Sequence, residues 1–113
     1  MKEQLITFET GTIAKEKGFQ SYTSFYYSEG MEIKGTKMGM HGNPNAYGGI
    51  SAPTQSLLQK WLREEHDLFI SVDKYEDKAD SYFISTNCIG IYGEFKTYEE
   101  ALEKGLVTAL KLI

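Results

Sequence analysis

The spacing of apolar residues between positions 51 and 73 changes abruptly from that of a helix to that of a strand. In SAPTQSLLQKWLREEH the apolar side chains share one helical stripe, and they are Leu57, Leu58, Trp61 and Leu62. Pro53 suits the first turn of this helix, because its missing N–H costs nothing there. Alternating apolar residues follow at once in DLFISVD, which predicts a strand. The helix must therefore end near His66, and we interpret Trp61 as an anchor of the core.

The other expected elements complete an α+β fold. A helix is predicted over 5–18 with Thr7 as its cap, and strands are predicted over 21–27, 31–34, 68–72, 81–85 and 88–95. Thr97-Tyr-Glu-Glu100 is a capping box that begins a last helix. The order is α-β-β-loop-α-β-β-β-α, and short connections between strands favour antiparallel pairing. We expect one domain over 1–113, with three helices and a mostly antiparallel sheet of about five strands.

Two glycines are predicted to have structural roles in the second half of the chain. Gly105 lies at the edge of the apolar stripe of the last helix, where a missing side chain lets a helix approach a sheet closely. Gly93 interrupts the last strand, which indicates a bulge or a close approach by another element. Both positions therefore predict packing of this helix and strand, and neither predicts chemistry.

The distribution of charge argues against nucleic acid and membrane as partners. The net charge is -4, and residues 1–52 contribute nothing to it, because five Lys balance five Glu. Residues 53–113 contain seven Lys and Arg against eleven Asp and Glu. Proteins that bind nucleic acid usually present a concentrated basic face, and this sequence has no basic cluster. There is also no apolar run of the ~20 residues that span a bilayer.

A glycine-rich loop is predicted over 34–50, with the sequence KGTKMGMHGNPNAYGGI. Loops longer than ~12–15 residues are uncommon in compact domains, and they are often either functional or disordered. This one contains hydrogen-bonding side chains that form our candidate binding set, namely His41, Asn43, Asn45 and Tyr47. Tyr22 and Tyr26, on one face of the first strand, form a second candidate surface. The alternative for the strand is packing, with one face on the core and the other covered by the loop, and the alternative for the loop is a mobile hairpin extension or disorder.

Motifs for catalysis and metal binding are nearly absent from the sequence. There is no Walker loop, no GxGxxG after a strand, no HExxH, no CxxC and no GxSxG. His41, His66 and Cys88 match no zinc spacing, so we expect no metal and no cofactor. His66 suits the end of a helix, and Cys88 suits a small core residue, because each lies in such a setting. The sequence therefore favours a non-catalytic protein over an enzyme, and it names no catalytic residue.

Residues 53–113 are similar in the order of their elements to the double-stranded-RNA-binding domain. Both run helix, three strands, helix. That family places a lysine cluster at the start of its last helix to contact phosphates, whereas this chain has Tyr98, Glu99 and Glu100 there. The resemblance therefore covers topology only, and the residues that would contact RNA do not carry over.

Two segments, SAPTQSLLQKWLREEHDL and KTYEEALEKGLVTALKLI, resemble the signature segments of a group of small uncharacterised proteins. These proteins are found in gut bacteria and in their phages and prophages. The two segments make up about a third of the chain, and the strands between them fit the group in length. The resemblance implies an accessory protein of a mobile element, and it implies no particular activity.

Three hypotheses of function follow from the sequence. The favoured one is a small, soluble, cytoplasmic interaction module that binds an unknown protein partner; a homo-oligomer is compatible with it. The single Cys88 and the lack of a signal-peptide core motivate the predicted compartment. The alternatives are a nucleic-acid-associated protein, suggested by topology alone, and a small-ligand binder that uses the 34–50 loop.

Overall fold

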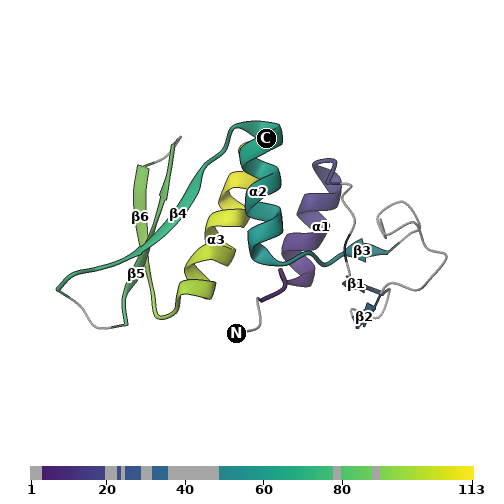
Figure 1. Ribbon diagram of the computed structural model, residues 1–113, viewed down its shortest axis with the longest axis horizontal. Coiled ribbons are helices and arrows are strands. Elements are labelled where there is room, and N and C mark those ends of the chain that lie inside the picture. The colour runs from purple at the N-terminus through teal and green to yellow at the C-terminus, as the bar shows by residue number, and fades with distance from the viewer. Residues whose placement is uncertain are drawn as a thin grey trace. The chain divides into compact units, whose positions relative to one another are not determined.

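The computed structural model describes residues 4–19, 23, 25–28, 32–35, 49–77, 80–87 and 90–113. Within these ranges there are three helices and six strands, in the order α1 (Phe8–Glu16), β1 (Phe25–Tyr27), β2 (Ile33–Gly35), β3 (Ile50–Ser51), α2 (Gln55–His66), β4 (Ile70–Lys74), β5 (Tyr82–Thr86), β6 (Gly90–Phe95) and α3 (Tyr98–Lys111) (Figure 1). The predicted α+β class, with antiparallel pairing and three helices, is confirmed. None of the described helices is long and apolar enough to cross a membrane.

The strands form two three-stranded sheets, where we expected about five strands in one sheet. The sixth strand is β3, whose two residues are too few to show alternation in the sequence. The chain divides into two compact units, residues 1–56 and 57–113, and each unit contains one sheet. The sheets have the orders β2-β1-β3 and β4-β5-β6.

In the first unit, α1 and the segment before it support the small sheet. Thr7 caps α1 as predicted, and its hydroxyl accepts a hydrogen bond from the backbone N–H of Thr10 at 3.2 Å. The Tyr27 hydroxyl donates to the backbone oxygen of Ile6 at 2.7 Å, and its ring meets that of Phe8 edge to face. Tyr27 therefore connects β1 to the start of α1 and to the segment before it.

In the second unit, one face of the β4-β5-β6 sheet packs against α3 (Figure 1). The predicted cap of α3 is confirmed, because the Thr97 hydroxyl accepts from the N–H of Glu100 at 3.1 Å. Gly105 of α3 faces Ile70 and Ile84, as expected for a glycine that allows close approach of a helix to a sheet. Ile84 is completely buried, so this contact lies in the core of the unit.

The predicted bulge in β6 is present at Gly93. Tyr82 pairs with Phe95 and Ile84 pairs with Tyr92, so Phe83 alone opposes two residues of β6. Gly93 has a φ of 87°, a left-handed conformation that glycine adopts without strain. The bulge shifts the alternation of β6 by one residue, which a strict period of two in the sequence cannot show.

The stripe of α2 is buried unevenly. Leu58 and Leu62 have no exposed surface, whereas Leu57 and Trp61 are half-buried. The Trp61 ring meets the His66 ring at 4.7 Å between centroids. Trp61, which we expected to be an anchor of the core, is therefore only half-buried. The two leucines one turn apart have that role.

Asn87 holds the connection between α2 and β4. Its side-chain amide donates to the backbone oxygen of Asp67 at 2.8 Å, and its side-chain oxygen accepts from the N–H of Phe69 at 3.0 Å. Asp67 has a φ of 54°, an uncommon conformation for a residue other than glycine. The Asn87 side chain thus satisfies backbone groups on both sides of a sharp reversal.

We predict that Asn87→Ala lowers the free energy of unfolding by about 1–2 kcal/mol, because two hydrogen bonds are lost at this reversal. Asn87→Asp keeps the acceptor for the N–H of Phe69 and loses the donor to the backbone oxygen of Asp67. The loss of stability should therefore lie between those of the parent and Asn87→Ala, unless the new carboxylate is repelled by that of Asp67, which would make the loss greater. Urea denaturation followed by circular dichroism measures both variants. An Asn87→Ala variant as stable as the parent would show that water replaces the side chain at no cost.

Candidate functional site

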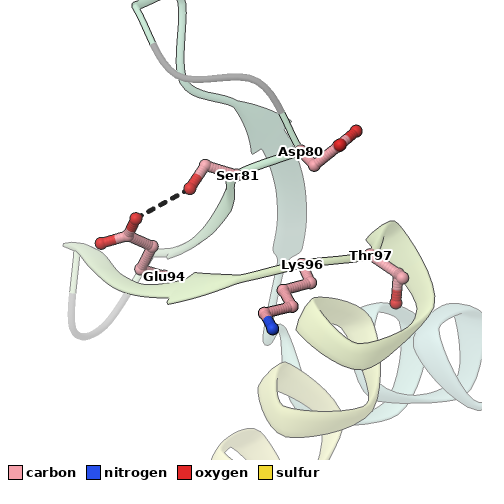
Figure 2. A pocket seen from close by; sticks show the side chains of 5 residues that line it. All are labelled: Asp80, Ser81, Glu94, Lys96 and Thr97. Carbon is pink, nitrogen blue, oxygen red and sulfur yellow. Dashed lines mark hydrogen bonds between the residues drawn. The ribbon is translucent and has the colours of Figure 1, made fainter.

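An open pocket in the second unit lies where the turn before β5 meets the junction of β6 and α3. Its lining residues are Asp80, Ser81, Glu94, Lys96 and Thr97. The Ser81 hydroxyl donates to a carboxylate oxygen of Glu94 at 2.8 Å. Figure 2 shows these two side chains pointing toward each other, while those of Asp80, Lys96 and Thr97 do not turn toward the pair.

The hydroxyl groups in the described lining of the pocket already have hydrogen-bond partners. The Ser81 hydroxyl donates to the exposed carboxylate of Glu94, the Thr97 hydroxyl accepts from the N–H of Glu100, and the described lining residues include no histidine or cysteine. Within the part of the chain that the structure describes, no group of three His, Cys, Asp or Glu side chains could hold a metal ion. The Ser81–Glu94 bond joins the start of β5 to β6, which is a structural role.

The structure places only one of the predicted site residues. Tyr26 lies in β1, half-buried, with Lys34 and Ser51 as its neighbours on the adjacent strands. The other five candidates fall outside the described residues, and they are Tyr22, His41, Asn43, Asn45 and Tyr47. The structure therefore describes the predicted 34–50 binding loop only at its two ends, where β2 and β3 lie.

A different surface, which the sequence analysis did not identify, lies in the first unit, on the strands that border this loop. Ile33 of β2 is 51% exposed and Phe25 of β1 is 43% exposed. Residues that pair directly share one face of a sheet, so Ile33 lies on the same face as its partner Tyr27, and Phe25 lies there too. On this face Tyr27 is buried, whereas its direct partner Ile33 and, two residues earlier in β1, Phe25 are exposed to solvent.

The backbone of β2 is also oriented for binding. The N–H of Ser28 donates to the oxygen of Glu32, which makes these residues a hydrogen-bonded pair. Because such pairs alternate, Lys34 also bonds toward β1, whereas the N–H and C=O groups of Ile33 and Gly35 point to the opposite side. We call this side, with the exposed side chains of Glu32, Ile33 and Lys34, the β2 edge.

Among the described strands, β2 has β1 as its only neighbour, so the β2 edge is the outer edge of the sheet that these described strands form. The hydrogen bonds on the other side of β1, toward β3, agree with this alternation. There the N–H of Ala52 donates to the oxygen of Phe25 at 3.0 Å. Phe25 therefore bonds toward β3, as the same alternation requires. An outer edge with backbone donors, acceptors and an apolar side chain can pair with another strand.

The chain was compared with protein-family models, curated proteins and solved structures, and no match was found in any of the three. The evidence for a site therefore comes from the geometry of the chain itself. The sequence analysis missed Phe25 and Ile33, because alternation places them on the face of Tyr27, and the candidate surface was the opposite face, that of Tyr22 and Tyr26. The charged neighbours Glu32 and Lys34 are the sequence signal that marks an outer strand.

Proposed function

We propose that the protein is a small, non-catalytic interaction module that binds a polypeptide at the β2 edge. The observation that carries the proposal is the exposure of Ile33 beside outward backbone groups of an outer strand. Large apolar side chains on such an edge usually make a contact in the functional state, because an uncovered edge promotes aggregation. Strand addition uses backbone hydrogen bonds for affinity and alternate side chains for specificity.

The resemblance of its sequence segments to proteins of gut bacteria and phages supports an accessory role in a phage, prophage or other mobile element. The resemblance itself implies no particular activity, so the argument for binding comes from the β2 edge. The proposal therefore concerns contact with another polypeptide chain, and the activity of that chain is a separate matter.

The order of the elements supports the nucleic-acid alternative, and the distribution of charge argues against it. The order α2-β4-β5-β6-α3 agrees with that of a double-stranded-RNA-binding domain. However, the turn after β4 contains Glu76 and Asp77, and the first turn of α3 contains Glu99 and Glu100, all exposed. Carboxylates at these places repel phosphates. The small-ligand alternative depends on loop residues outside the described ranges.

Site-specific cross-linking tests the proposed function. A photo-reactive amino acid such as benzoylphenylalanine is placed at position 33, or at Lys104 on the exposed side of α3 as the matched control. The full chain is expressed in a gut bacterium, irradiated and analysed by mass spectrometry. We expect one polypeptide to be cross-linked repeatedly, through one segment, at position 33 and not at position 104.

Two results would contradict the proposed function. The first is an absence of any cross-linked polypeptide at position 33, with efficient activation of the probe shown by its adducts with C–H groups of the chain itself. The second is the same set of adducts at positions 33 and 104, which would indicate random encounters. A Phe25→Ala variant that weakens cross-linking would support the apolar face as part of the contact.

A further inference from the structure

We infer that the strand that binds the β2 edge is β2 of a second copy of this chain, paired antiparallel with Ile33 opposite Ile33. This inference rests on the proposed function and names its partner. It would join two three-stranded sheets into one sheet of six strands through a twofold axis. The backbone pattern, the charges beside Ile33 and the exposed apolar side chains each favour this partner.

The backbone of the β2 edge can pair with itself. In an antiparallel ladder, the residues that exchange hydrogen bonds are those whose N–H and C=O groups point to the shared edge. Ile33 has this orientation, because Lys34 and Glu32 bond toward β1. Ile33 of each copy can therefore donate to and accept from Ile33 of the other, which gives two hydrogen bonds about the axis.

The charges select this register. With Ile33 opposite Ile33, Glu32 of each copy lies opposite Lys34 of the other, so two pairs of opposite charge form. These are pairs without mutual backbone hydrogen bonds, in which side chains approach most closely. Sliding one strand along the other until Lys34 lies opposite Lys34, a shift of two residues, would place like charges together at the axis. The pattern Glu-Ile-Lys is therefore complementary to itself in one antiparallel register.

The exposed apolar side chains fit the same arrangement. In the proposed pair, the two Ile33 side chains lie side by side on one face, and Glu32 and Lys34 lie on the other face. Phe25 is on the Ile33 face of the neighbouring strand. The two most exposed apolar side chains of the described part of the first unit are thus on the face that the second copy would extend. Pairing would reduce the exposure of Ile33 directly.

Charge exchange tests the inference with matched variants. Sedimentation equilibrium on the full chain should show a concentration-dependent dimer. Lys34→Glu and Glu32→Lys should each raise the dissociation constant by about tenfold, because two attractive pairs become two repulsive ones. The double variant E32K/K34E restores both pairs with their signs exchanged, so its dissociation constant should return to within about threefold of the parent.

The two single variants should also bind each other when mixed, because one then has two carboxylates at the edge and the other has two ammonium groups. Ile33→Pro is a backbone test. It removes an N–H that points away from β1, so the hairpin should be kept while the dimer is lost. Circular dichroism of the variant, unchanged from the parent, confirms that the fold is kept.

A chain that stays monomeric at millimolar concentration would overturn the inference, and so would a dimer whose stability is the same in all three charge variants. The cross-linking result separates this failure from that of the proposed function. A different polypeptide captured at position 33 by a monomeric chain keeps the proposed function and rejects self-pairing. A cross-linked product of twice the chain mass that forms from the purified protein supports both.

Discussion

Leu62→Ala should lower the free energy of unfolding by about 2–5 kcal/mol, and Trp61→Ala should lower it by about half as much. Leu62 has no exposed surface, so its truncation leaves a cavity that the neighbouring side chains fill only in part. Trp61 is half-buried, and part of its ring already contacts water. Size alone would predict the opposite order, because tryptophan has the larger apolar surface.

The comparison between Leu62 and Trp61 requires a probe other than tryptophan fluorescence, since Trp61 is the only tryptophan of the chain. Urea denaturation followed by far-ultraviolet circular dichroism serves both variants and the parent. Leu58→Ala is the matched control, because Leu58 lies one turn away in α2 and is also completely buried. A loss for Trp61→Ala equal to that for both leucine variants would show that its ring closes the core.

The burial of α2 illustrates how much of this fold the sequence determines. Periodicity identifies the helix, its end near His66 and the stripe that faces inward, because these depend on local spacing. The stripe has two rows, Leu58 with Leu62 and Leu57 with Trp61, and only the first row is completely buried. Which row lies deeper depends on packing against other elements, and local spacing does not contain that information.

The capped helix α3 and the strands before it were predictable for the same reason. Thr97 and the residues after it form a local cap signal, and Gly105 interrupts an apolar stripe in a recognisable way. In contrast, β3 is two residues long and is paired with a strand more than twenty residues earlier. Strand pairing over such a separation is a property of the folded chain, so the two-sheet arrangement did not follow from the sequence.

The candidate site shows the same division between local and long-range information. A glycine-rich loop with hydrogen-bonding side chains can be recognised from composition, which indicated 34–50, and the alternation of the first strand indicated Tyr26. The β2 edge depends on which backbone groups point outward, and that depends on the register of Tyr27 with Ile33. A shift of one residue in this register would reverse the orientation of every backbone group in β2. The pairing had to be known before the edge could be proposed.

The close approach of α3 to its sheet should make position 105 intolerant of larger residues. A Cβ atom at Gly105 would lie 2.9 Å from Cγ2 of Ile70 and 3.0 Å from Cγ2 of Ile84, which is shorter than normal contact. Gly105→Val adds two further methyl groups at this place, so either α3 or the sheet must move. We expect the free energy of unfolding to fall by about 3 kcal/mol, at the upper end of the range for overpacked cores.

Gly105→Ala separates the steric effect from the effect of helix propensity. Alanine adds one methyl group that clashes with Ile70, but it favours the helix by about 1 kcal/mol relative to glycine. The net loss should therefore be near zero to 2 kcal/mol, well below that of valine. Ile70→Ala, alone and combined with Gly105→Ala, tests the contact itself, because it removes Cγ2 of Ile70, the atom that faces position 105, so Gly105→Ala should cost less in this background than in the parent. Urea denaturation should place Gly105→Val below Gly105→Ala, and a Gly105→Val variant as stable as the parent would mean that α3 does not lie this close to β4 and β5.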